Sequence, residues 1–186
     1  MAAISSLKNM ALCLTAVCLV CSAVVGLAYV VTKAPIEAAA QAKTTASIAA
    51  VLPAFTGTPE QGSVSVDGAD YTYYRTDSGF AIISTTSGFG GPLTLMVGIA
   101  ADGTIHNTAV LSHSETPGLG AKCTTDAHFI GQFRGFDPKS KSLSVKKDGG
   151  DLDAITASTI TSRAYALAVA QAVKVYNQLT GGQGNE

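Results

Sequence analysis

The chain has little charge. Only 13% of its 186 residues are Asp, Glu, Lys or Arg, about half of the usual fraction. Twelve basic and 13 acidic residues leave a net charge of −1, so the basic surplus of a nucleic-acid binder is missing. Hydrophobic residues make up 47%, which excludes the polar, charged composition of a disordered chain. The length fits one ordinary domain plus an appendage.

Cysteines and metal-ligand motifs are also scarce. Cys13, Cys18 and Cys21 lie in one apolar run, with a spacing that matches plant-type iron–sulfur proteins. Cluster ligation needs a loop that wraps the metal, so we interpret these three as small packing residues of a helix. Cys123 stands alone outside the run and cannot form an internal disulfide. No metalloprotease or serine-hydrolase motif occurs, and the three histidines show no ligand spacing.

One segment has no charge at all. No charged residue lies between Lys8 and Lys33. About 22 apolar residues suffice to cross a hydrocarbon core of roughly 30 Å as a helix, whereas the apolar region of a cleaved signal peptide has only about 7–15. We therefore expect an uncleaved transmembrane helix over residues 9–32, set in the lipid bilayer, after a short stub of residues 1–8. The flanking charges nearly balance, so they indicate no orientation.

The remaining sequence predicts an α+β domain with an antiparallel sheet and packed helices. Residues 33–62 are expected to form a juxtamembrane helix, ending before Pro53, and a linker. The domain proper is expected over residues 63–180, with a tail at 181–186. Period-two segments predict strands over 71–75, 80–84 and 93–99, and the last is paired through Asp102-Gly103 with a strand over 104–112. We also predict a helix over 121–133, a strand over 142–146, and a long helix from Ser162 with an apolar stripe. The lysines near the 142–146 strand are interpreted as its solvated face rather than as a basic patch.

A hydroxyl-rich turn precedes the long helix. Residues 153–162 read DAITASTITS. The first N–H groups of a helix lack internal partners and favour anions, so such a turn suits a phosphate. Helix capping is the competing interpretation, since Asp, Ser and Thr are preferred caps. One cap needs one hydroxyl, whereas this turn offers five.

A glycine-proline loop forms the second unusual segment. Residues 113–122 read HSETPGLGAK. Gly118 and Gly120 allow the backbone to approach a flat ligand closely, and Pro117 stiffens the loop. The third glycine of a dinucleotide fingerprint is missing, so the loop by itself names no ligand.

Together, SETPGLG, the later DAITASTIT and the apolar segment resemble the FMN-binding domain of the Rnf and Nqr membrane electron-transport complexes. The resemblance is closest to the family of Rnf G subunits, with the C subunits of the Na⁺-translocating NADH:quinone reductase as the sister family. It implies covalent FMN, joined by a phosphoester to Thr159, with Asp153 as the acidic residue that a flavin transferase reads. The other cofactor-binding residues that it implies are Glu115, Thr116, Gly118, Leu119, Gly120, Thr156, Ala157 and Ser158. Ala157 and Ser158 depart from the family's usual Gly and Ala, and Ser158 adds a competing hydroxyl.

The resemblance implies an electron-relay subunit without activity of its own. Its FMN would carry electrons within a bacterial inner-membrane complex that couples electron transfer to ion translocation. Its partners would be the other membrane subunits and, during maturation, the flavin transferase; its domain would be extracytoplasmic (periplasmic). Nucleic acid is not expected as a partner. The alternative is a membrane-anchored binding or structural module with no redox group.

Overall fold

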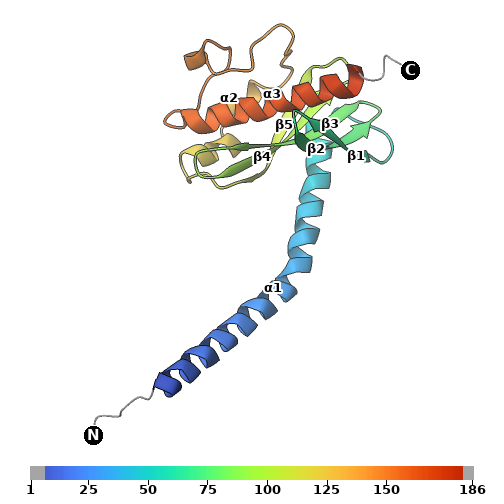
Figure 1. The fold of residues 1–186 in the computed structure, drawn as a ribbon. Helices are drawn as coiled ribbons and strands as arrows, with labels where there is room; N and C mark the ends of the chain where they lie inside the picture. The colour runs from blue at the N-terminus through green and yellow to red at the C-terminus, as the bar shows by residue number, and fades with distance from the viewer. Residues whose placement is uncertain (1–6, 182–186) are drawn as a thin grey trace. The chain divides into compact units, whose positions relative to one another are not determined.

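A computed structural model describes residues 7–181 of the chain (Figure 1). Its contacts divide the chain into two units, with the boundary between Lys43 and Thr44. Each unit is described by itself. The parts of the predicted stub and tail at residues 1–6 and 182–186 lie outside the described range.

The first element is the helix α1, Leu7–Val51. Among the described residues it is the one helix long and apolar enough to cross a membrane, in agreement with the predicted span. The span and the juxtamembrane helix were expected as separate segments, but the helix continues through Pro35. A proline inside a helix removes one backbone hydrogen bond, and the Ala-rich sequence on its C-terminal side favours continuation.

The second unit contains an antiparallel sheet of five strands in sequence order; its strands are labelled in Figure 1. The strands are β1 (Glu60–Val66), β2 (Ala69–Thr76), β3 (Gly79–Ser87), β4 (Pro92–Ala100) and β5 (Ile105–His113). Strands β2 to β5 confirm the predicted strands and the hairpin at Asp102-Gly103. The sequence did not predict β1. With this strand the sheet begins at Glu60, three residues before the expected domain boundary.

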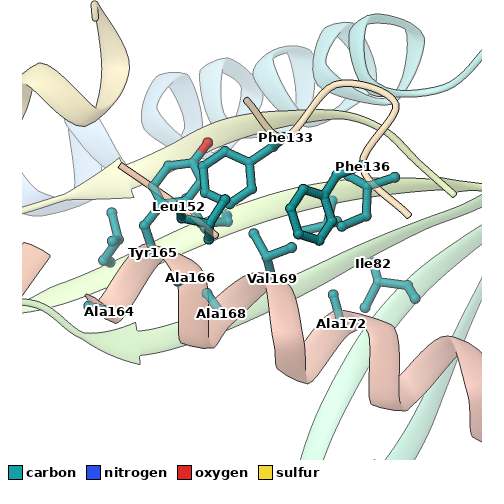
Figure 2. Close-up of a cluster of buried hydrophobic side chains, with 14 of the residues drawn as sticks. Ile82, Phe133, Phe136, Leu152, Ala164, Tyr165, Ala166, Ala168, Val169 and Ala172 are labelled. Carbon is teal, nitrogen blue, oxygen red and sulfur yellow. The ribbon is translucent and has the colours of Figure 1, made fainter. Parts of the chain in front are cut away.

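The helix α3, Thr159–Gly181, packs on one face of this sheet. Period-two alternation directs Ile82, Leu95 and Val97 to that face, where they belong to one buried cluster with Tyr165 and the small residues of the helix. Figure 2 shows Ile82 of the sheet next to Ala172 of the helix. The predicted apolar stripe is thus a core face. Two buried hydrogen bonds join the layers: Thr108 to the Tyr165 hydroxyl at 2.7 Å, and Thr86 to the Ala164 carbonyl at 2.9 Å.

The other face of the sheet contacts the last turns of α1. Ile48 and Val51 are buried there with Met96 and Ala81. Gly98 makes this contact possible, because a side chain at that position would collide with the carbonyl of Val51. The end of α1 therefore belongs to the core of the second unit.

Two predicted elements are wrong. The helix expected over 121–133 is two short pieces, η1 (Gly120–Thr124) and α2 (Ala127–Gly131). Asp126 separates them, since its carboxylate accepts from the N–H groups of His128 and Phe129 and so starts a new helix. The strand expected over 142–146 is a loop with the single turn η2 (Lys146–Asp148) and one bridge, Val145 to Leu152.

Candidate flavin site

The turn before α3 has an unusual backbone. Ser158 N–H donates to the Ile155 carbonyl at 3.0 Å, which closes a turn with Thr156 and Ala157 at its centre. Ala157 has a φ of 61°, in the left-handed region that type II turns require at this position and that glycine adopts most easily. The glycine that the resemblance leads us to expect at this position would adopt this backbone without strain. Here an alanine tolerates the same backbone at some cost.

The start of α3 leaves N–H groups open. The first intrahelical bond runs from Ser162 N–H to the Ser158 carbonyl, so the N–H groups of Thr159, Ile160 and Thr161 have no acceptor within the helix. Ser158 stands in the capping position, yet its hydroxyl does not cap. Ser158 is 7% exposed, and across residues 7–181 its Oγ is the one buried side-chain oxygen or nitrogen without a hydrogen-bond partner.

The neighbouring hydroxyls have other tasks. Ser162 Oγ donates to the Ser158 carbonyl and accepts from Ile155 N–H, both at 2.9 Å, which holds the turn against the helix. Thr161 Oγ1 donates to Glu115 Oε2 at 2.9 Å. Simple capping thus does not explain the hydroxyl-rich turn, and an open, electropositive end remains.

Glu115 connects three segments distant in sequence. Its carboxylate, 6% exposed, accepts from Phe89 N–H at 2.8 Å and Gly90 N–H at 3.4 Å on the β3–β4 loop, and from Thr161 on α3. Gly120 must be a glycine, because a side chain there would collide with the Glu115 carboxylate and approach Thr161 Oγ1 to 2.8 Å. The conformation of the 115–120 loop is therefore determined by the buried Glu115 carboxylate, against which the loop packs.

These segments enclose a cavity of about 380 Å³, within the range of small-molecule and cofactor sites. Three large apolar side chains stand at it with much of their surface open to solvent: Phe89 (69% exposed), Ile160 (51%) and Leu119 (45%). Backbone N–H groups and hydroxyls lie at the helix start, and apolar surface lies beside them. The lining residues are Phe89, Glu115, Thr116, Leu119, Gly120, Ala157, Ser158, Thr159, Ile160 and Thr161.

The structure brings together most of the residues predicted for the site. Seven of them line the cavity, namely Glu115, Thr116, Leu119, Gly120, Ala157, Ser158 and Thr159. Gly118 and Thr156 lie in the adjoining turns, Gly118 with a φ of 76°. Asp153 lies outside the lining, where its carboxylate pairs with Lys146 at 2.8 Å. Gln132 fixes the Asp153 backbone, donating to its carbonyl and accepting from its N–H.

Four site residues were missed by the sequence reasoning. Phe89, Ile160 and Thr161 line the cavity, and Lys147 Nζ donates to Thr159 Oγ1 at 3.3 Å. The glycines around Phe89 and the hydroxyl of Thr161 were visible in the sequence, but nothing there joined them to Glu115. The sequence pattern gave no reason to separate Lys147 from the neighbouring lysines that are interpreted as a solvated face.

Within residues 7–181, no group of three or more His, Cys, Asp or Glu side chains could hold a metal ion. Cys123 is fully buried near Glu115. Burial, reinforced by the nearby Glu115 charge, raises the pKa of its thiol to about 11, so Cys123 is a protonated packing residue at neutral pH.

Residues 88–174 match the FMN-binding domain family. The matched range runs from the β3–β4 loop into α3 and holds every residue that lines the cavity. This match agrees with the FMN-binding domain predicted from the sequence.

The more particular likeness is to G subunits of ion-translocating complexes. The chain is 37% identical over 107 residues to the G subunit of the proton-translocating ferredoxin:NAD(+) oxidoreductase complex of Clostridium ljungdahlii, covering 56% of each chain. It is 45% identical over 95 residues to the G subunit of the ion-translocating oxidoreductase complex of Vibrio atlanticus, covering 49% of this chain and 46% of the relative. The chain thus spans about half the length of these curated relatives. Shewanella oneidensis NqrC, a crystal structure, matches over 61% of each chain with 25% identity and a TM-score of 0.46.

Proposed function

We propose that this chain is a membrane-anchored flavoprotein subunit that carries FMN on Thr159 through a phosphoester. It relays electrons within a membrane complex that couples electron transfer to ion translocation, and it has no activity alone. The observation that carries the proposal is the buried, unpartnered Ser158 hydroxyl beside open helix N–H groups, at a cavity inside an FMN-binding domain. A phosphate at this point would accept from these donors. The relatives' names support the role in a complex.

Accessibility favours Thr159 over Ser158 as the attachment residue. Thr159 is half-buried, and its hydroxyl faces the exposed Lys147. Ser158 Oγ is buried at the wall of the cavity, so an external enzyme that carries a dinucleotide has less access to it than to the half-buried Thr159. Ser158 instead suits a donor to a bound phosphate oxygen. The extra hydroxyl in this chain's motif thus has a binding role rather than a competing one.

The apolar side chains at the cavity suit the ring system of a flavin. Phe89, Leu119 and Ile160 offer apolar surface, and Glu115 holds the Phe89 loop and the 115–120 loop in place. When bound, FMN supplies the one- or two-electron chemistry, and the protein contributes position and the surrounding electrostatics. The covalent link keeps the cofactor on a domain whose cavity has solvent-exposed apolar side chains at its wall.

Attachment requires a separate enzyme, because an unassisted threonine hydroxyl is a poor nucleophile and no carboxylate or imidazole contacts Thr159 in the described part of the chain. A flavin transferase that uses FAD and Mg²⁺ is the partner for this step, and Asp153 is the acidic residue that it reads. Because such a transferase acts outside the cytoplasm, the domain that it modifies lies on the extracytoplasmic side of the bacterial inner membrane. The helix α1 makes the chain a single-pass protein.

The test is co-expression of the full chain with a flavin transferase, followed by a denaturing gel and intact-mass measurement. The wild type is expected to show in-gel flavin fluorescence and the added mass of FMN. Thr159→Ala is expected to lose both, whereas Ser158→Ala, the matched control one residue away, keeps them. An unlabelled wild type would favour the binding or structural module without a redox group. Label that persists in Thr159→Ala would overturn the assignment of the residue.

A further inference from the structure

The segment Lys146–Asp148 is fastened to the start of α3 at both ends. On one side, Lys146 Nζ lies 2.8 Å from the Asp153 carboxylate. On the other, Arg163 binds Asp148 through two hydrogen bonds, from Nε at 2.7 Å and from Nη2 at 2.6 Å. The bidentate pair holds the pKa of Asp148 below its ordinary value. Both flanking residues thus have their charge compensated.

Lys147 lies between these two pairs. Its ammonium donates to Thr159 Oγ1 at 3.3 Å, and its side chain is exposed. Across residues 7–181 no carboxylate lies within ion-pair distance of it. The segment therefore directs a positive charge that forms no ion pair at the hydroxyl proposed for attachment, although the neighbouring Asp148 carboxylate interacts with it electrostatically.

An independent feature indicates that an anion belongs at this point. Ser158 Oγ is buried without a partner and lines the same cavity as Thr159. The open N–H groups of the 23-residue helix α3 stand beside it. A buried hydroxyl without a partner costs free energy, and an anion held here would supply its acceptor.

We propose that Lys147 is the cation that faces the phosphoryl group during attachment of FMN, and that the ion pairs Lys146–Asp153 and Arg163–Asp148 exist to hold it there. This inference rests on the proposed function. In the step, Thr159 Oγ forms a bond to the phosphorus of the FMN half of FAD. The bridging P–O bond to the AMP half breaks, AMP leaves, and the hydroxyl proton passes to a base of the transferase. No oxidation or reduction occurs.

The charge of Lys147 would act most strongly when the phosphorus is five-coordinate. At that point negative charge accumulates on the phosphoryl oxygens next to Thr159 Oγ, and a fixed ammonium stabilises it. Charge-assisted hydrogen bonds are about twice as strong as neutral ones. We expect removal of the charge to slow attachment about tenfold, equivalent to about 1.4 kcal/mol in the barrier.

The experiment follows attachment by intact mass against time, with full-length apo-protein in detergent, purified transferase, FAD and Mg²⁺. The variants are Lys147→Gln, which removes the charge, and Lys147→Arg, which keeps it. Lys174→Gln is the matched control, because Lys174 is an exposed lysine of α3 that pairs with Asp67 at 3.4 Å, away from the cavity. Thermal unfolding of each apo-protein is recorded alongside, and every assay is repeated at low and high salt.

The expected result is an attachment rate about tenfold lower for Lys147→Gln, near the wild type for Lys147→Arg, and unchanged for Lys174→Gln. The ratio between wild type and Lys147→Gln should narrow at high salt, because exposed charges are screened; a purely structural role would not respond in this way. A Lys147→Gln rate within about twofold of the wild type, or an equally slow Lys147→Arg, overturns the inference and leaves the proposed function intact. A wild type that takes up no FMN overturns both.

Discussion

Replacement of Glu115 by alanine should destabilise the folded domain even without flavin. The change leaves two well-formed donors, Phe89 N–H at 2.8 Å and Thr161 Oγ1 at 2.9 Å, without their acceptor. Thr161 is 1% exposed, so water cannot easily replace the carboxylate there. Each buried donor left unpaired costs about 1–3 kcal/mol. We expect the free energy of unfolding to fall by about 2–6 kcal/mol, or by about 1–3 kcal/mol if water reaches Phe89 N–H.

Glu115→Gln should cost less, about 1 kcal/mol. The amide oxygen can still accept from Phe89 N–H, and the amide nitrogen can donate to Thr161 Oγ1, whose hydroxyl proton then needs a new acceptor. The exposed Glu60 on β1 supplies the control. Its replacement by alanine should change the free energy of unfolding by no more than about 0.5 kcal/mol.

The assay is urea unfolding of the flavin-free full chain in detergent. Tyrosine fluorescence is the signal, since the chain has no tryptophan and five of its six tyrosines lie beyond residue 43. A loss below about 1 kcal/mol for Glu115→Ala would refute the reasoning. It would mean that Glu115 serves the ligand alone and that the two loops hold their shape without it.

Three further predictions concern the turn, the ion pair and the buried thiol. Ala157→Gly should raise the unfolding free energy by about 0.5–1 kcal/mol by relieving the left-handed backbone; a loss in urea unfolding would contradict this. Because the Lys146–Asp153 pair holds the segment that carries Lys147, Lys146→Gln should slow FMN attachment. Asp153→Asn should slow it further, because the transferase then also loses the carboxylate that it reads. Intact-mass time courses measure both rates, and an unchanged rate for Lys146→Gln would contradict the role of the ion pair. Cys123 should resist alkylation at pH 8 in folded protein and react in urea, as peptide mapping would show. Because folding raises the pKa of this thiol to about 11, its contribution to stability is complete below about pH 9 and declines as the pH rises toward 11. Rapid alkylation of folded protein would refute its burial.

Local patterns predicted most of the fold. The alternation in β2 to β5 and the apolar stripe of α3 each have one regular period, and the tight turn at Asp102-Gly103 joins two of the strands. β1 has the sequence EQGSVSV and an exposed pattern along most of its length, so an edge strand of this kind gives little hydrophobic signal. Residues 142–146 do alternate in the sequence, but the structure pairs them only through the single bridge between Val145 and Leu152.

The site divides in the same way. Thr159 and the 115–120 loop were predicted because they lie in two contiguous motifs. Phe89, Glu115 and Thr161 meet only through the folded sheet and helix, across separations of 26 and 46 residues. Lys147 looked like its lysine neighbours, because the two ion pairs that distinguish it depend on Asp153 and Arg163. Long-range contacts between single side chains produce no periodic pattern in the sequence, so they could not be predicted from it.

The turn that presents Thr159 has a consequence for the order of events in the cell. Four hydrogen bonds among Ile155, Ser158 and Ser162 hold the turn that presents this hydroxyl, and they form only once α3 has begun at its proper residue. If Thr159 is the acceptor, an unfolded chain offers its hydroxyl on a flexible peptide, without the turn that holds it in the folded domain. Attachment of FMN is then selective for folded chains. The fraction of a preparation that carries flavin therefore reports the fraction of chains that had folded before attachment.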